Sequence, residues 1–161
     1  KRGASGSPGE LRGDFDLTRD LGSLYANTEC GIFGVLPQEN RPEAVWEAIP
    51  VARRTEVRTG KAVILANCRG DEVCAYEIEI EKLYGGSAPT RNLLLRVTDP
   101  ALIALTGGIV QGMSGSPIVQ DGKLVGAVTH VLLDDPQRGY GILAENMLSA
   151  SGMTAQSAAS A

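Results

Sequence analysis

The sequence predicts an all-β protein, either a barrel or a sandwich of short antiparallel strands. Its apolar runs are short, and Gly, Pro, Asn or Asp bounds each of them, as is typical of such sheets. Twenty glycines indicate many turns, and helical signals are scarce. With 161 residues, of which 43% are hydrophobic, the chain is long enough to bury the core of one domain.

The clearest expected strand covers residues 73–80. Here Tyr76, Ile78 and Ile80 alternate with glutamates, so one face of the strand is buried and the other faces water. The other expected strands are shorter runs at residues 32–36, 44–49, 62–66, 93–97, 109–110, 118–119, 124–133 and 140–143.

Two short helices are expected among these strands. Asp99 is a favourable N-cap and Pro100 suits the first helical position, which predicts one or two turns over residues 101–105. A second helix is expected at residues 143–149.

The chain is expected to form one domain with loose ends. Residues 1–20 are rich in Gly, Ser and charge and are predicted to be a loop or a mobile arm. The folded domain is predicted at residues 21–150, followed by a small, polar, mobile tail at 151–161. Because the chain begins at Lys1 rather than at Met, we expect a processed or shortened form of a longer protein.

The composition argues against several function classes. The net charge of −4 comes from interspersed signs without a basic block, which disfavours nucleic-acid binding. No apolar run approaches the roughly 20 residues of a membrane-spanning helix, so no membrane segment is predicted. The acidic pair Asp134-Asp135 lies in a proline-containing turn without the spacing of a metal loop, and no metal or cofactor is expected.

The three cysteines match no zinc pattern. Cys68 and Cys74 flank the turn that begins at Arg69, so a cross-strand disulfide is geometrically feasible in an oxidising space. The alternative is that they and Cys30 are free, partly buried thiols.

The segment around Ser114 carries the strongest chemical signal. Acyl transfer needs an exposed hydroxyl on a tight turn, beside backbone N–H groups that receive the developing oxyanion. Glycines on both sides of Ser114 permit such a turn. We expect Ser114 to be the nucleophile, with the N–H groups of Gly112 and Ser114 as the oxyanion donors.

A β-hairpin follows this turn at once. Asp121-Gly122 between two apolar runs is a hairpin signal. A nucleophile turn followed by a hairpin fits the second barrel of a trypsin-like peptidase, whereas an α/β-hydrolase would need a helix after the serine. The alternative is an ordinary Gly/Ser turn.

Residues 107–142, GGIVQGMSGSPIVQDGKLVGAVTHVLLDDPQRGYGI, closely resemble the carboxy-terminal signature of the stage IV sporulation protein B peptidases. The resemblance also includes residues 30–36 and 97–100 and spans roughly 7–148. It implies a trypsin-like two-barrel serine peptidase fold with a complete second barrel and an incomplete first barrel. Such a first barrel has exposed edges, which favour a homodimer or strand exchange between chains.

The resemblance also implies a catalytic triad that this chain does not complete. The family's acid lies in the TDP segment, which corresponds to Asp99, although Asp99 could instead serve only as the helix cap. The family's histidine lies earlier in the domain, and no histidine precedes His130 here. The general base is therefore sought upstream of Lys1, and the fragment is expected to be inactive.

Two residues of the chain are weaker candidates for the base. His130 follows the hairpin, where trypsin-like folds carry the strand that pairs with the substrate backbone. It could be a general base, line the substrate groove or be a structural histidine. Lys123 lies beside the exposed Asp121-Gly122 turn, which disfavours a Ser-Lys dyad.

Five residues are expected to contact the substrate: Ile109, Gln111, Thr129, His130 and Tyr140. No carboxylate stands at the floor of the expected pocket, so a cationic substrate side chain would be buried without a partner. A broad preference for small or medium apolar side chains follows.

By resemblance, the function is that of an extracytoplasmic endopeptidase of the sporulation signalling type. It would act between the forespore and mother cell membranes and cleave a membrane-bound regulator of an intramembrane protease. The alternative is a non-catalytic peptide-binding module derived from such a peptidase.

Overall fold

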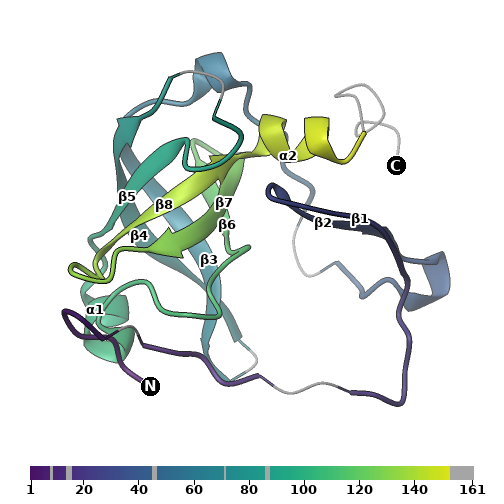
Figure 1. Ribbon diagram of the computed structural model, residues 1–161, viewed down its shortest axis with the longest axis horizontal. Helices are drawn as coiled ribbons and strands as arrows, with labels where there is room; N and C mark the ends of the chain where they lie inside the picture. Colours follow the sequence, from purple (N-terminus) through teal and green to yellow (C-terminus); the bar gives the residue numbers. More distant parts are fainter. Residues whose placement is uncertain (8, 14–15, 45–46, 71, 86–87, 153–161) are drawn as a thin grey trace.

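The computed structural model describes residues 1–7, 9–13, 16–44, 47–70, 72–85 and 88–152. Its strands form two separate sheets, which confirms the predicted all-β class (Figure 1). The larger sheet is a closed barrel in the order β3-β4-β5-β8-β7-β6, and the smaller is the hairpin β1-β2. The strands are β1 (Ser23–Thr28), β2 (Gly31–Val35), β3 (Gly60–Arg69), β4 (Glu72–Leu83), β5 (Leu93–Val97), β6 (Pro117–Gln120), β7 (Lys123–Val131) and β8 (Arg138–Leu143).

The barrel closes around side chains that alternate along its strands. In β4, Tyr76, Ile78 and Ile80 are buried and Glu77 is exposed, as the period of two predicts. β3 pairs antiparallel with β4 and places Ile64 opposite Tyr76. The largest fully buried side chains are Ile64, Ile78, Ile80, Leu93, Leu95, Leu102, Ile109, Met113, Ile118, Ile142, Val97 and Val125.

Three stretches differ from the predicted strands, and one of them is the run 109–110, which carries no strand. In the run 44–49, the described residues 44 and 47–49 carry no strand, and residues 45–46 lie outside the described part. Pro42 and Pro50 flank this run, and proline cannot donate a hydrogen bond to a strand ladder. Conversely, β1 is not predicted, because SLYANT lacks a regular alternation of apolar and polar residues.

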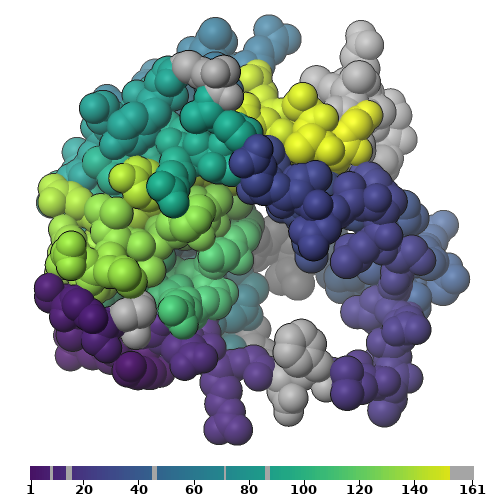
Figure 2. Space-filling model, in the orientation of Figure 1, coloured from purple at the N-terminus to yellow at the C-terminus, as the bar shows by residue number. Residues whose placement is uncertain are grey.

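The β1-β2 hairpin is a second, two-stranded sheet, where the family resemblance implies an incomplete first barrel. Figure 2 shows it beside the barrel, where it meets the rest of the molecule near α2 (Ala144–Ala150). The Tyr25 hydroxyl donates to the Ser151 carbonyl at 3.1 Å. Leu24 and Ile32 are 68% and 65% exposed, so two strands alone do not bury the apolar side chains of this sheet.

Both predicted helices are present. α1 (Pro100–Thr106) begins at Asp99, whose Oδ1 accepts from the backbone N–H groups of Ala101 and Leu102 at 2.8 and 3.0 Å. α2 begins one residue later than predicted. Two 3-10 turns, Gln38–Asn40 and Arg54–Glu56, complete the helical structure of the described residues.

The N-terminal residues are hydrogen-bonded to the barrel, and the C-terminal residues follow α2. The N-terminal residues lie at the barrel end that carries α1 (Figure 1), where Gly3 N donates to Thr106 O at 2.7 Å. Residues 16–20 are exposed. After α2 the chain makes a turn at 151–152, and the remainder of the expected tail, 153–161, lies outside the described residues.

All three cysteines are free thiols. Cys68 and Cys74 lie near the tip of the β3-β4 hairpin, half-buried against the core. Burial raises the pKa of the Cys68 thiol. Burial, with a smaller contribution from Cys68, raises the pKa of Tyr76 to about 12.

Glu81 ties three barrel strands together, and its charge should stabilise the fold. On the outer face of β4 its carboxylate contacts Arg138 Nε at 2.8 Å and Arg96 Nε at 3.0 Å. The bond from Arg138 lowers the pKa of Glu81 below its ordinary 4.5. The stabilisation is therefore present above the ordinary glutamate pKa and is lost as the pH falls through the lowered value.

Replacing Glu81 by Gln should lower the melting temperature at pH 7, and this difference should shrink as the solution is acidified below the ordinary glutamate range. Thermal unfolding followed by circular dichroism across the acid range measures it. Glu77→Gln, at an exposed position of the same strand, is the matched control and should show no such trend. An equal loss at all pH values would contradict an electrostatic role for Glu81.

Candidate functional site

The turn that presents Ser114 is built by two glycines and a buried methionine. Gly112 and Gly115 have φ angles of 95° and 91°, in the left-handed region that favours glycine. Met113 is 1% exposed and anchors the turn in the core, whereas Ser114 lies on the surface. The sequence therefore folds locally so that the hydroxyl is exposed while the residue before it is buried.

The backbone of this turn leaves two N–H groups available. Met113 N donates to Val110 O at 3.1 Å, and Gly115 N donates to Val128 O at 2.8 Å. Within the described part of the chain, the N–H groups of Gly112 and Ser114 donate to no other group. These are the two donors that the sequence assigns to an oxyanion.

The Ser114 hydroxyl donates to the backbone carbonyl of Thr129 at 2.9 Å. β6 pairs with β7 only up to Ala127, so residues 129–131 of β7 have β8 as a neighbour on one side, and on the other side the described bond is the one from Ser114 to Thr129. A carbonyl oxygen accepts a hydrogen bond but cannot take up the proton. In this conformation Ser114 is therefore held in place but is not activated.

Asp99 lies at the same end of the barrel as Ser114, because in the antiparallel order β5 ends where β6 begins. Its Oδ1 accepts the two N–H groups that cap α1, and its Oδ2 accepts Glu77 N at 3.1 Å. A carboxylate has about four acceptor positions. One position on Oδ2 is thus left for a further donor, and no described hydrogen bond joins Asp99 to Ser114 or His130.

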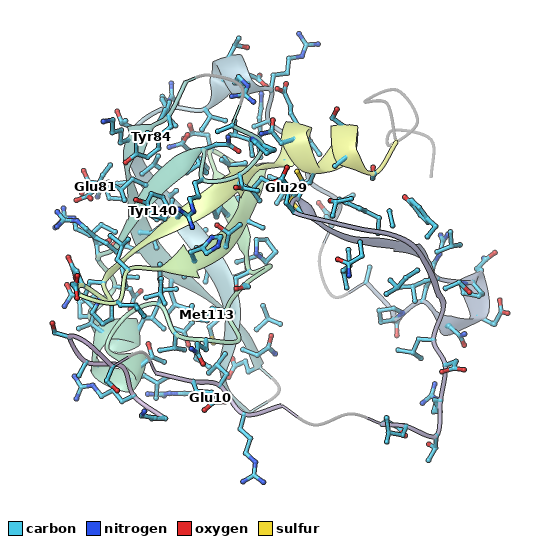
Figure 3. The ribbon with its side chains drawn as sticks, viewed as in Figure 1. Glu10, Glu29, Glu81, Tyr84, Met113 and Tyr140 are labelled. Atoms are coloured by element: carbon cyan, nitrogen blue, oxygen red, sulfur yellow. The ribbon has the colours of Figure 1, made fainter. Side chains whose placement is uncertain are left out.

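His130 and Tyr140 lie on neighbouring strands and line a groove of about 720 Å³ together with Glu29, Tyr84 and Arg91. Figure 3 shows Tyr84 and Tyr140 on the barrel and Glu29 at the tip of the β1-β2 hairpin that faces it. The Arg91 guanidinium lies 5.5 Å from the centre of the Tyr140 ring. His130 is exposed in this groove and makes no described hydrogen bond to Ser114 through its side chain.

The remaining predicted site residues lie in different surroundings. Ile109 is 2% exposed and belongs to the barrel core, and it shows no strand. Gln111 is exposed and directly precedes the Ser114 turn. Thr129 contributes its carbonyl to Ser114, and its own hydroxyl donates to Tyr140 O at 3.2 Å.

Lys123 lies far from this end of the barrel. It opens β7, whereas residues 129–131 close it, and its Nζ pairs with Glu56 Oε1 at 2.5 Å. The geometry thus gives no support to a Ser114-Lys123 dyad.

The described residues hold neither a metal-binding cluster nor a membrane-spanning helix. No group of three or more His, Cys, Asp or Glu side chains among them is placed to hold a metal ion. No helix within the same residues is long and apolar enough to cross a membrane.

Sequence reasoning missed one neighbour of the site. Glu10 forms a parallel β-bridge with Gln111, just before the nucleophile turn. The two residues are about a hundred positions apart, and no local pattern around Glu10 indicates the pairing.

The chain is similar to known proteins in sequence and in fold. The SpoIVB peptidase S55 family model matches residues 1–148. Among solved structures, the Rv3671c protease from M. tuberculosis in its active form superimposes with a TM-score of 0.55 and 21% identity, over 83% of this chain and 59% of that chain. Its inactive form gives 0.54 and 20%, over 81% and 65%.

The chain thus spans less than two thirds of the length of these structures. The likeness shows a trypsin-like protease fold, as the sequence predicted. No curated protein matches the sequence.

Proposed function

Because this chain belongs to the SpoIVB peptidase S55 family, we propose that it is the nucleophile-bearing part of a serine endopeptidase in which Ser114 attacks the scissile carbonyl. The observation that carries the proposal is the Ser114 turn. It exposes one hydroxyl between two left-handed glycines and leaves the N–H groups of Gly112 and Ser114 unpaired in the described structure. This is the arrangement that acyl transfer requires.

The contacts of Ser114 suggest how a substrate would engage it. When the hydroxyl leaves the Thr129 carbonyl, that carbonyl becomes free to accept an N–H from the substrate backbone along the open edge of residues 129–131. Ser114 Oγ then bonds to the scissile carbon, and its proton passes to a general base and on to the leaving amine. Water completes the reaction by hydrolysing the acyl-enzyme ester.

The general base is proposed to come from residues that precede Lys1 in a longer form of the protein. The chain's one histidine, His130, lines the groove, and its side chain makes no described hydrogen bond to Ser114. An imidazole that reached Ser114 could donate its other N–H to the remaining acceptor position of Asp99 Oδ2. In that arrangement Asp99 would cap α1 and orient the base at once.

The substrate class follows from the family. A peptidase of this kind takes a protein or peptide, and its family suggests an extracytoplasmic place of action. By the resemblance described above, we propose a membrane-bound regulator of an intramembrane protease as the substrate, in the space between forespore and mother cell. A peptide could lie along residues 129–131, with side chains reaching the groove at His130 and Tyr140.

A fluorophosphonate labelling experiment tests the proposal. A longer form that carries the residues before Lys1 should be labelled stoichiometrically on Ser114 and should lose peptidase activity in parallel. The 161-residue chain alone should react at least about 100-fold more slowly, because a positioned base contributes 10²–10⁴ to such a step. Fast labelling of the short chain would show that a base is already present, and unlabelled Ser114 in both forms would favour a peptide-binding module.

A further inference from the structure

The N-terminal arm, defined here as the described residues 1–7 and 9–11, follows the barrel end that carries Ser114. Figure 2 shows it lying along that end of the barrel, and Figure 3 shows Glu10 at the same end as Met113. Gly3 N donates to Thr106 O at 2.7 Å, and Gly6 N donates to Leu133 O at 2.8 Å. The arm is thus bonded both to the end of α1 and to the loop after β7.

The arm reaches the nucleophile turn through Gln111. Gln111 N donates to Gly9 O at 2.9 Å, and Leu11 N donates to Gln111 O at 2.8 Å, so both backbone groups of Gln111 are bound by the arm. Leu11 is half-buried against the core. A Cβ on Gly112 would lie 3.0 Å from Leu11 Cβ, which shows how closely the arm approaches the turn.

This closeness depends on glycine at position 9. Gly9 is buried, and a Cβ there would lie 2.5 Å from both Gly3 N and Lys1 O and 2.6 Å from Val110 Cγ1. Two of these are backbone atoms, which cannot move aside without displacing the arm. By contrast, a Cβ on Gly13, a little further along the chain, would meet nothing within 4 Å.

The hydrogen bond from Leu11 N to Gln111 O also fixes the direction of the Gly112 N–H group, one of the two expected oxyanion donors. Gln111 C=O and Gly112 N–H belong to one planar trans peptide unit, so they point in opposite directions. Holding the carbonyl on Leu11 N directs the Gly112 N–H away from the arm. A peptide next to a glycine rotates at little steric cost, and Gly112 is in the left-handed region at φ 95°, so without this bond the orientation has little local support.

We infer that the Leu11 N–H is a positioning group of the peptidase: it holds the Gln111–Gly112 peptide so that Gly112 N–H faces the site where the oxyanion forms. The inference rests on the proposed function, because only in a serine peptidase does the Gly112 N–H bind an oxyanion. It assigns the arm a part in catalysis, although the arm contributes no side chain to the reaction.

The test compares Leu11→Pro with Leu11→Ala in the longer, histidine-containing form. Both variants lose the leucine side chain, but only proline lacks the N–H donor. Relative to Leu11→Ala, Leu11→Pro should lower kcat by about 10²-fold, the cost of one lost oxyanion donor, with KM within about twofold. Affinity for a peptide boronic acid, which forms a tetrahedral adduct with serine, should fall in parallel, whereas affinity for a product peptide should not.

A second pair of variants keeps the inference testable if Leu11→Pro does not fold. Gly9→Ala should lower kcat and boronate affinity in the same way, and Gly13→Ala is its matched control. In the 161-residue chain, Gly9→Ala should also speed hydrogen exchange of the Gln111 amide. Equal kinetics within each pair, in a longer form that is otherwise active, would overturn the inference. No cleavage by the unsubstituted longer form would instead overturn the proposed function.

Discussion

Replacing Ser114 by alanine in the histidine-containing form should lower kcat by about 10⁶-fold, the size of effect seen when a serine peptidase loses its nucleophile. No other hydroxyl of the turn can take over. Ser116 N donates to Met113 O at 2.9 Å and Ser116 O accepts Val128 N at 3.0 Å. The backbone of Ser116 is therefore already bonded to β7, beyond the exposed turn that presents Ser114. Hydrolysis of a fluorogenic peptide under saturating conditions measures kcat directly.

Ser116→Ala is the matched control for this experiment. It removes a half-buried hydroxyl two residues further on, and it should leave kcat within about tenfold of the unsubstituted protein. Both variants should unfold at similar temperatures, because neither side chain belongs to the core. Appreciable cleavage by Ser114→Ala would end the assignment of Ser114 as nucleophile, and the peptidase proposal with it.

Replacing Asp99 by asparagine should separate its two roles. Asparagine is as good an N-cap as aspartate, so its side-chain oxygen can still accept Ala101 N and Leu102 N and keep α1 capped, although its amide nitrogen cannot accept from Glu77 N as Oδ2 does. An amide cannot hold an imidazole in the same tautomer, and in serine peptidases this exchange costs about 10⁴ in kcat. We therefore expect Asp99→Asn to keep the fold and the capped α1, with a small loss of stability from the unpaired Glu77 N, and to lose about 10⁴ in kcat.

Asp99→Ala completes this comparison. It removes the cap as well as the charge, so it should lower the free energy of unfolding by about 1 kcal/mol in addition to the loss of activity. Chemical denaturation and peptide hydrolysis on the same samples report the two effects. If Asp99→Asn retained activity within about tenfold, Asp99 would be a helix cap only and the orienting acid would have to be another carboxylate.

Local patterns in the sequence determined several parts of this structure. The alternation in β4 buried Tyr76 and Ile78 as expected, because a pleated strand sends successive side chains to opposite faces. Asp99 and Pro100 set the start of α1 through the steric and hydrogen-bonding needs of a first helical turn. The exposed position of Ser114 likewise follows from the glycines on either side, whose φ angles few other residues adopt.

Only the tertiary structure decided which distant groups meet. The burial of Ile109 in the core, the contact between Ser114 and Thr129, and the pairing of the arm with Gln111 each depend on how the barrel closes. Backbone N–H and C=O groups are the same in every residue type except proline, so the sequence near Leu11 carries no signal for its partner a hundred residues away. The nucleophile turn could therefore be predicted from the sequence, whereas the groups that hold it in place could be identified only in the fold.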